Sequence, residues 1–162
     1  MKKVRKIEIV LSLLFFLTLS QVVVASENPK QYPSRGSFGI GMVIPAGITL
    51  KYWTSSVNGL DLKLGWGQDK EKSRLCFDYL WHNFNFFEES KSQKLAFYYG
   101  LGGKLHFGEY NDYIGLRMVF GISYIFPTTP FDLFLELSPT LLLSPETNFE
   151  TDAGIGLRYF FR

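Results

Sequence analysis

From Phe38 to the C-terminus, apolar side chains recur at every second position, and this period constrains the fold more than any other feature. Successive side chains of a β-strand point to opposite faces, so a period of two predicts strands with two different faces. Breaks rich in proline, glycine, serine and asparagine divide the pattern into eight segments. The expected strands are residues 38–44, 48–53, 60–67, 75–82, 95–107, 114–124, 131–138 with an extension past Pro139 to Leu143, and 152–161.

Consecutive strands with hairpin-length links predict an all-β fold, an eight-stranded antiparallel up-and-down barrel. Closure of such a meander into a barrel removes the exposed strand edges. The alternation does not by itself say which face is inside. A soluble lipocalin-like carrier has its apolar face inside, whereas a transmembrane barrel has its apolar face against lipid.

Glycines and charges favour the transmembrane arrangement. The non-apolar face is rich in glycine, which is a poor choice for a solvated strand but leaves room inside a narrow barrel. Its charges are balanced five against five, as expected for a buried ion-pair network. The proposed interior charges are Lys51, Asp61, Lys63, Asp78, Lys104, Arg117, Asp132, Glu136, Asp152 and Arg158.

The other face carries almost no charge and is loaded with aliphatic and aromatic residues, which make up much of the 17% aromatic content. Trp66, Trp81 and several tyrosines lie on it, as expected for residues that prefer the membrane interface. Trp53 has the opposite parity and does not fit a lipid-facing aromatic girdle. The segment 83–92 carries three phenylalanines, which predict either an aromatic belt, the favoured interpretation, or an exposed contact surface.

The N-terminus predicts export. Four basic residues precede an apolar stretch from Ile9 to Leu19, and small residues lead to a cleavage site after Ala25. We therefore expect a signal peptide at 1–25, a flexible leader at 26–36 and the barrel at 37–162. Cleavage lowers Lys+Arg from 17 to 13 and Asp+Glu from 15 to 14, so the mature net charge is about −1. This charge gives no support to nucleic-acid binding, and Cys76 has no cysteine partner for a disulfide.

The C-terminal strand adds a targeting pattern. Ile155, Leu157, Tyr159 and Phe161 resemble the assembly signal of bacterial outer-membrane barrels, and the whole chain resembles the small OmpA/OmpX-type barrels. Its motifs also look like a family of short bacterial barrel proteins to which no activity is assigned. These motifs are Gly41-x-x-x-Pro45-x-Gly47, Lys51-Tyr52-Trp53, residues 79–83 (YLWHN) and residues 154–160 (GIGLRYF). The resemblance implies an integral bacterial outer-membrane protein that contacts lipid and is inserted by the barrel-assembly machinery.

No catalytic, cofactor-binding or metal-binding residues are predicted. A lipid-A or phospholipid-modifying barrel enzyme needs a nucleophile, a base and a group that orients the base. The histidines are His82 and His106, and neither stands in a His-x-Ser arrangement. We expect both to be interior or rim residues, and expect a structural or surface-interaction role, with an envelope or host ligand left open. A lipocalin-like carrier and a lipid-modifying enzyme remain alternatives.

Overall fold

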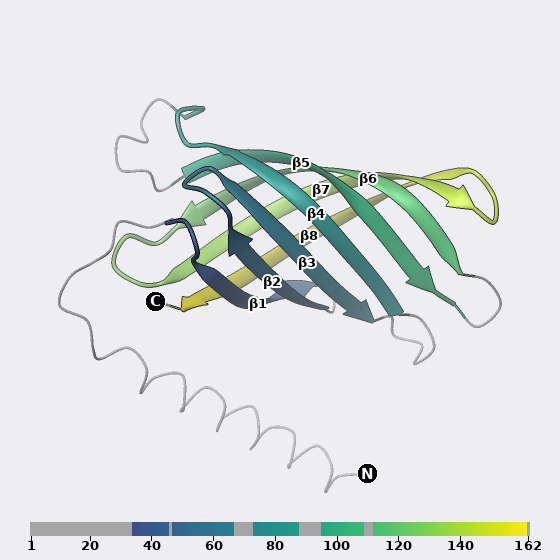
Figure 1. The fold of residues 1–162 in the computed structure, drawn as a ribbon, viewed down its shortest axis with the longest axis horizontal. Coiled ribbons are helices and arrows are strands. Elements are labelled where there is room, and N and C mark those ends of the chain that lie inside the picture. Colours follow the sequence, from purple (N-terminus) through teal and green to yellow (C-terminus); the bar gives the residue numbers. More distant parts are fainter. Residues whose placement is uncertain (1–33, 46, 67–72, 88–94, 109–111, 162) are drawn as a thin grey trace, which may run out of the picture. The chain divides into compact units, whose positions relative to one another are not determined.

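The structure, a computed structural model, describes residues 34–45, 47–66, 73–87, 95–108 and 112–161. Eight antiparallel strands, each paired with its neighbours in sequence, form a barrel that β8 closes by pairing with β1 (Figure 1). The strands are β1 (Phe38–Ile44), β2 (Gly47–Trp53), β3 (Asn58–Trp66), β4 (Ser73–Asn83), β5 (Leu95–Phe107), β6 (Tyr113–Ile125), β7 (Phe131–Ser144) and β8 (Asn148–Phe161). The predicted all-β up-and-down barrel is confirmed.

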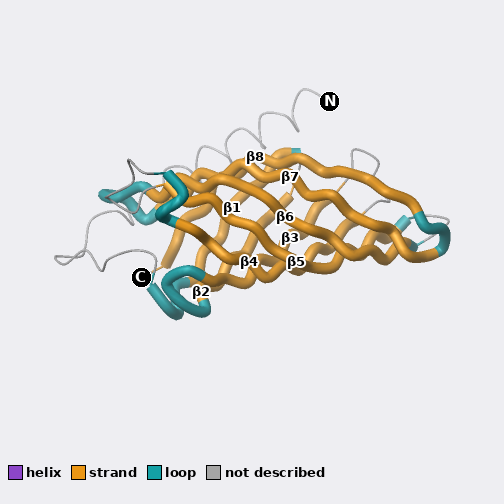
Figure 2. Tube along the Cα trace, turned by 90° about the horizontal axis from the view of Figure 1, so that it is seen from above, coloured by secondary structure: helices purple, strands orange, loops and turns teal. Residues whose placement is uncertain are grey.

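Strands and turns account for the described chain (Figure 2). Within that part of the protein, no helix has the length and apolarity needed to cross a bilayer. The predicted signal peptide, its cleavage site after Ala25 and most of the leader lie outside the described residues. The last leader residues, Ser34–Gly36, form a turn, and the Gly36 amide donates a hydrogen bond to the Trp53 carbonyl at 2.7 Å.

Several strands extend beyond their expected bounds: β4 begins at Ser73 rather than at Leu75, and β8 begins at Asn148 rather than at Asp152. β7 continues through Pro139, as the pattern indicated, and ends at Ser144. Proline is tolerated in β7 because the register with β6 passes from Arg117–Thr140 to Phe120–Leu137 without a pair at Pro139. Proline lacks a backbone N–H, and a strand position that forms no ladder hydrogen bond on one side does not require one.

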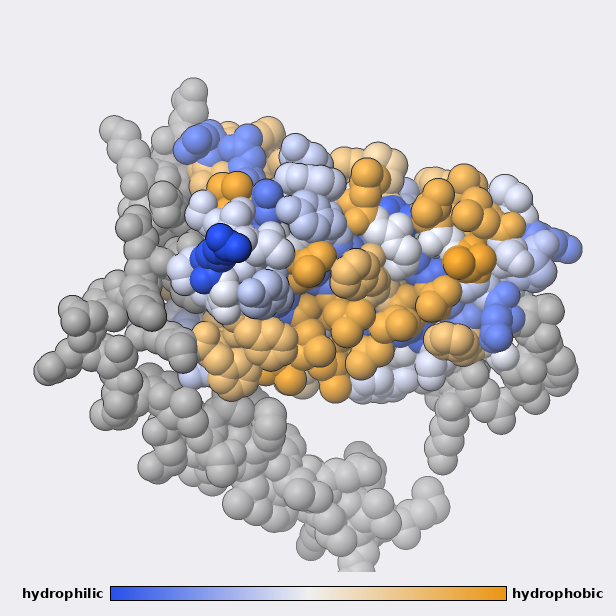
Figure 3. All heavy atoms as spheres, viewed as in Figure 1, coloured by the Kyte–Doolittle hydropathy of each residue, from blue (hydrophilic) through white to orange (hydrophobic). Residues whose placement is uncertain are grey.

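The apolar side chains lie outside and the polar ones inside. On β6 the exposure alternates strictly from Ile114 to Ile125, with exposed Leu116 and Met118 flanking the buried Arg117. On the face shown in Figure 3, hydrophobic side chains cover the middle of the wall and hydrophilic ones gather toward its two ends. This is the reverse of a soluble barrel, in which the apolar face forms the core.

Glycines on the inner face make room for aromatic rings on neighbouring strands. The ring of Tyr98 lies over Gly121, that of Phe134 over Gly156 and that of Phe160 over Gly39. A Cβ added at any of these glycines would lie within 2.6 Å of a ring atom, which is closer than van der Waals contact allows. The excess of glycine is therefore a packing requirement of a narrow lumen filled by side chains.

Because the number of strands is even, the start of β1 and the end of β8 lie at the same end of the barrel, where Phe38 pairs with Phe161. We call this the terminal end and the opposite one the far end. The β1–β2, β3–β4, β5–β6 and β7–β8 connections lie at the far end, because each follows an odd-numbered strand.

Candidate functional site: the ionic interior

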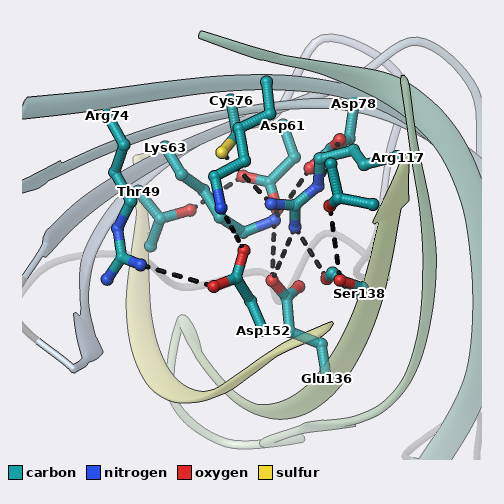
Figure 4. A network of polar contacts seen from close by, with 12 residues as sticks. Thr49, Asp61, Lys63, Arg74, Cys76, Asp78, Arg117, Glu136, Ser138 and Asp152 are labelled. Carbon is teal, nitrogen blue, oxygen red and sulfur yellow. Dashed lines mark hydrogen bonds and ion pairs between the residues drawn. The ribbon is translucent and has the colours of Figure 1, made fainter. Parts of the chain in front are cut away.

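The structure places all ten predicted interior charges on the inner face of the barrel, on the seven strands from β2 to β8 (Figure 4 shows part of the set). Nine are buried, and Asp152 is half-buried near the far end. Ion pairs divide nine of the ten into two groups. The central network comprises Asp61, Lys63, Asp78, Arg117, Asp132, Glu136 and Arg158, and the rim cluster comprises Arg74, Lys104, Glu150 and Asp152.

Arg158 of β8 anchors one end of the central network. Its Nη2 lies 2.7 Å from Asp61 Oδ2, and its Nη1 lies 3.3 Å from Asp132 Oδ2. Its Nε donates to Thr49 Oγ1 at 3.1 Å, and Thr49 in turn donates to Asp61 at 2.7 Å. The guanidinium carbon stands 3.7 Å from the centroid of the Phe134 ring. Each nitrogen of this buried cation thus has a carboxylate or hydroxyl partner, and an aromatic ring lies over the guanidinium.

Lys63 of β3 joins three carboxylates from three strands. Its Nζ lies 3.0 Å from Asp61, 3.1 Å from Asp78 and 3.1 Å from Glu136. Asp61 and Asp78 are direct cross-strand partners, an arrangement in which like charges destabilise a sheet. The ammonium group between them converts this repulsive pair into an attractive triad.

Arg117 of β6 continues the network. Its Nε is 3.0 Å from Asp78 Oδ1, an ion pair without the alignment of a hydrogen bond. Its Nη2 donates to Ser138 Oγ at 2.7 Å and to Glu136 Oε1 at 3.3 Å, and its Nη1 donates to Cys76 Sγ at 3.1 Å. The lone thiol of the chain is thus a buried neighbour of a guanidinium.

The rim cluster lies nearer the far end and was found only in part from the sequence. Lys104 binds both Glu150 and Asp152, with Nζ 2.7 Å from the latter, and Arg74 Nη1 lies 3.6 Å from Asp152. Arg74 and Glu150 were missed because the expected strands began one residue after Arg74 and two after Glu150. Their parity places them on the inner face with Cys76 and Asp152, so extending each strand would have found them.

Lys51 is the predicted charge that forms no ion pair with a carboxylate among the described residues. Its Nζ hydrogen-bonds His82 Nε2 at 2.8 Å and stands 4.4 Å from the centroid of Trp53. Trp53, which did not fit a lipid-facing girdle, is fully buried, and its ring contacts His82 at 4.5 Å between centroids. Trp53 therefore belongs to the lumen, where it packs with Ile125, Phe160 and Phe84.

Charge balance links Lys51 to the central network. The network contains three cations and four carboxylates, and the fully buried Lys51 on the adjacent β2 supplies the fourth cation. The rim cluster balances separately, with two cations and two carboxylates. Counted with Lys51, each group has a net formal charge of zero, which lowers the cost of keeping charges away from bulk water.

The two histidines lie on different strands, His82 on β4 and His106 on β5. His82 is buried, and its ring nitrogens contact Lys51 Nζ and the Val57 carbonyl oxygen at 3.1 Å. His106 lies beside Tyr113, with ring centroids 5.8 Å apart. Among the described residues, no three His, Cys, Asp or Glu side chains are grouped to hold a metal ion.

The four residues of the predicted assembly signal share the outer face of β8. Their register partners on β1 are Ile44, Met42, Ile40 and Phe38, also on the outer face, and the rings of Phe38 and Phe161 stack at 6.1 Å. Of the phenylalanines in the segment 83–92, Phe86 stacks on the outward Phe97 at 4.9 Å, whereas Phe84 packs against the buried Trp53 group. Residues 88–92 lie outside the described residues.

Comparisons with known proteins give the fold a counterpart. No protein-family model matches the sequence, and no curated protein matches it significantly. Chains of known structure do match, among them the N-terminal β-barrel domain of OprF from Pseudomonas aeruginosa, with a TM-score of 0.60 and 17% identity. The match covers 78% of this chain and 98% of that domain. The chain has the fold of a small OmpA-like barrel. At this identity the similarity concerns the fold, and membership of the short-barrel family stays a prediction.

Proposed function

We propose that the protein is an integral β-barrel of the bacterial outer membrane with a structural or surface-interaction role and no catalytic activity. The observation that carries the proposal is the polarity of the wall: charges are buried in the lumen and large apolar side chains are exposed around it. Soluble proteins rarely expose contiguous apolar patches beyond a few hundred Å². A lipid environment removes this exposure from water without changing the fold.

The filled lumen argues against the lipocalin-like carrier. Such a carrier needs an apolar cavity inside the barrel, and here the inner face carries the central network together with Trp53, Tyr98 and Phe134, all fully or almost fully buried. The side chains that would line a hydrophobic cavity point outward instead. The geometry therefore favours lipid outside the barrel over lipid inside it.

The contacts of His82 argue against a lipid-modifying enzyme. A general base must reach a nucleophile, but His82 Nε2 contacts Lys51 Nζ and Nδ1 contacts the Val57 carbonyl oxygen. Burial behind Trp53 and Phe84 also separates this ring from any substrate in the membrane. A role in packing the terminal end of the lumen accounts for these contacts.

Membrane fractionation combined with gel mobility tests the proposal. We expect the protein in the outer-membrane fraction, resistant to alkaline extraction, and migrating differently in SDS gels before and after boiling, as closed membrane barrels do. Recovery from the soluble periplasmic fraction with no change of mobility on boiling would refute it and would favour the carrier.

Lipid analysis tests the absence of catalysis separately. Cells carrying His82→Ala or His106→Ala are expected to have the same lipid A and phospholipid profile as cells carrying the wild-type gene. A change in either profile, seen in a variant whose heat-modifiable mobility is intact, would establish the enzyme instead.

A further inference from the structure

The wall of the barrel is much lower on one side than on the other. β1 and β2 have 7 residues each, whereas β7 and β8 have 14, and the β7–β8 hairpin reaches far past the β1–β2 turn (Figure 1). At about 3.3 Å per residue and a tilt near 45°, 7 residues rise about 16 Å and 14 rise about 33 Å. A transmembrane strand needs about 9–11 residues, so the low side falls short of the far interface of a bilayer.

The low side leaves an opening in the wall, which we call the notch. The β1–β8 register ends at Ile44–Ile155, so that in the described registers residues 148–154 of β8 pair with β7 alone. Pro45 forms the floor of the notch, Gly154 and Asp152 one side, and Gly65 and Arg74 the other. Among the residues that the structure describes, none of the strands closes the wall here, so the polar interior faces sideways at a height where a full wall would face lipid.

Arg74 spans the notch and is held loosely. Its Nη1 lies 3.6 Å from Asp152, and its Nη2 donates to the Pro45 carbonyl at 3.4 Å. Figure 4 shows the guanidinium extended toward Asp152 from the opposite wall. Asp152 is already bound by Lys104 at 2.7 Å, so the charge of Arg74 is the less compensated one. With 28% of its side chain exposed, Arg74 keeps donors free to bind a further acceptor at the opening.

The sequence provides space for this side chain. A Cβ at Gly65, the cross-strand partner of Arg74, would collide with the Arg74 stem. Glycine at this position lets the arginine lie across the inner face of β3 toward the notch instead of being forced away from the wall.

The outer surface of the barrel exposes large apolar side chains most strongly beside the notch. Ile44 is 69% exposed, and Met42 and Phe149 are 64% exposed, the highest values for large hydrophobic residues in the described chain. Ile44 and Met42 flank the floor, whereas Phe149 lies opposite Leu141 on the part of β8 that pairs with β7 alone. A cation at an opening with an apolar rim matches a molecule with an anionic head and hydrocarbon chains.

We propose that the notch binds the phosphate group of a membrane lipid, with Arg74 donating to the phosphate and the acyl chains lying against Ile44 and Met42. A guanidinium is suited to this role because its planar donors match phosphate oxygens in pairs. The inference rests on the proposed membrane location. The ligand is a lipid rather than free phosphate, because the apolar rim would contribute nothing to binding an inorganic anion.

Native mass spectrometry of the full-length protein in detergent tests the proposal. With phosphatidylglycerol added, the wild-type protein is expected to retain one lipid, and Arg74→Gln to retain it about tenfold more weakly, because a hydrogen bond to a charged group is lost. Arg74→Lys, which keeps the charge but loses the paired donors, is expected to lie between them. Arg35→Gln removes an exposed cation outside the notch and serves as the matched control.

Two ligand controls separate the sources of binding. Diacylglycerol, which has the chains without the phosphate, and inorganic phosphate, which has no chains, are both expected to bind weakly and not to displace phosphatidylglycerol. Equal lipid retention by the wild type and Arg74→Gln, or displacement by inorganic phosphate, would overturn the inference. Heat-modifiable mobility of each variant is measured in parallel. A loss of lipid binding at the notch is thereby distinguished from a failure of the protein to form a membrane barrel.

Discussion

At the scale of single residues, the interior depends on cations placed between carboxylates that would otherwise repel one another. Lys63 is the clearest case, because it lies about 3 Å from carboxylates of Asp61, Asp78 and Glu136. Removal of one partner from a buried ion pair costs more than the pair contributes, since the remaining charge is left uncompensated. The network is therefore sensitive to each of its members.

Lys63→Met is expected to lower the free energy of unfolding by about 3–5 kcal/mol, because three carboxylates lose their shared ammonium group. Urea unfolding in detergent micelles, followed by tryptophan fluorescence, measures the change. Arg35→Met, the loss of an exposed cation, is the control and is expected to have an effect within about 0.5 kcal/mol. Similar values for the two variants would contradict the assignment of a buried network.

Single residues also account for the glycines of the inner face, which make room for aromatic rings. Gly156→Ala is expected to destabilise the barrel by about 1–3 kcal/mol, because the new methyl group would overlap the ring of Phe134. Gly103→Ala is a matched control on β5, since its Cβ would meet nothing nearer than a carbonyl oxygen at 3.9 Å. Unfolding of both variants in urea gives the comparison, and an equal loss would mean that the packing of ring on glycine is not the cause.

At the scale of elements, β8 has two parts with different neighbours. Residues 155–161 close the barrel against β1, whereas residues 148–154 pair with β7 alone in the described registers and border the notch. The outward residues of the closing part are the predicted assembly signal. Closure of the barrel requires this part of β8 to pair with β1. Its outward aromatic residues are therefore well placed for recognition by the assembly machinery before that pairing forms.

Phe161→Ser is expected to reduce the fraction of protein that reaches the folded, heat-modifiable form in cells. Phe107→Ser is the control, because it removes an outward phenylalanine of similar exposure, 46% against 51%, from the end of β5. Comparison of boiled and unboiled membrane samples by immunoblotting measures the folded fraction. Equal folded fractions in the two variants would remove the case for a C-terminal signal.

At the scale of the whole molecule, the lumen is blocked at more than one level. Trp53, Phe160 and Ile125 fill it near the terminal end, and the central network crosses it further along. The wild-type protein is therefore expected to show no stepwise ion conductance in planar lipid bilayers. Stable conductance steps at neutral pH would contradict the filled lumen. A doubly substituted Trp53→Ala, Arg158→Ala protein, which opens both levels, provides the positive comparison.

The sequence by itself determined the strands, the two faces and the side of each charge, because a period of two follows from backbone geometry within one strand. The pairing of those charges was not determined in this way. Arg158 meets Asp61 from 97 residues away, and Lys63 meets Glu136 across the lumen, contacts that depend on barrel closure and register. Strand ends were also beyond the pattern, so Arg74 and Glu150 were missed. The notch also depends on barrel closure. The pattern indicated short first and second strands and a long seventh, but only the tertiary structure shows that β8 begins at Asn148 and that residues 148–154 pair with β7 alone in the described registers.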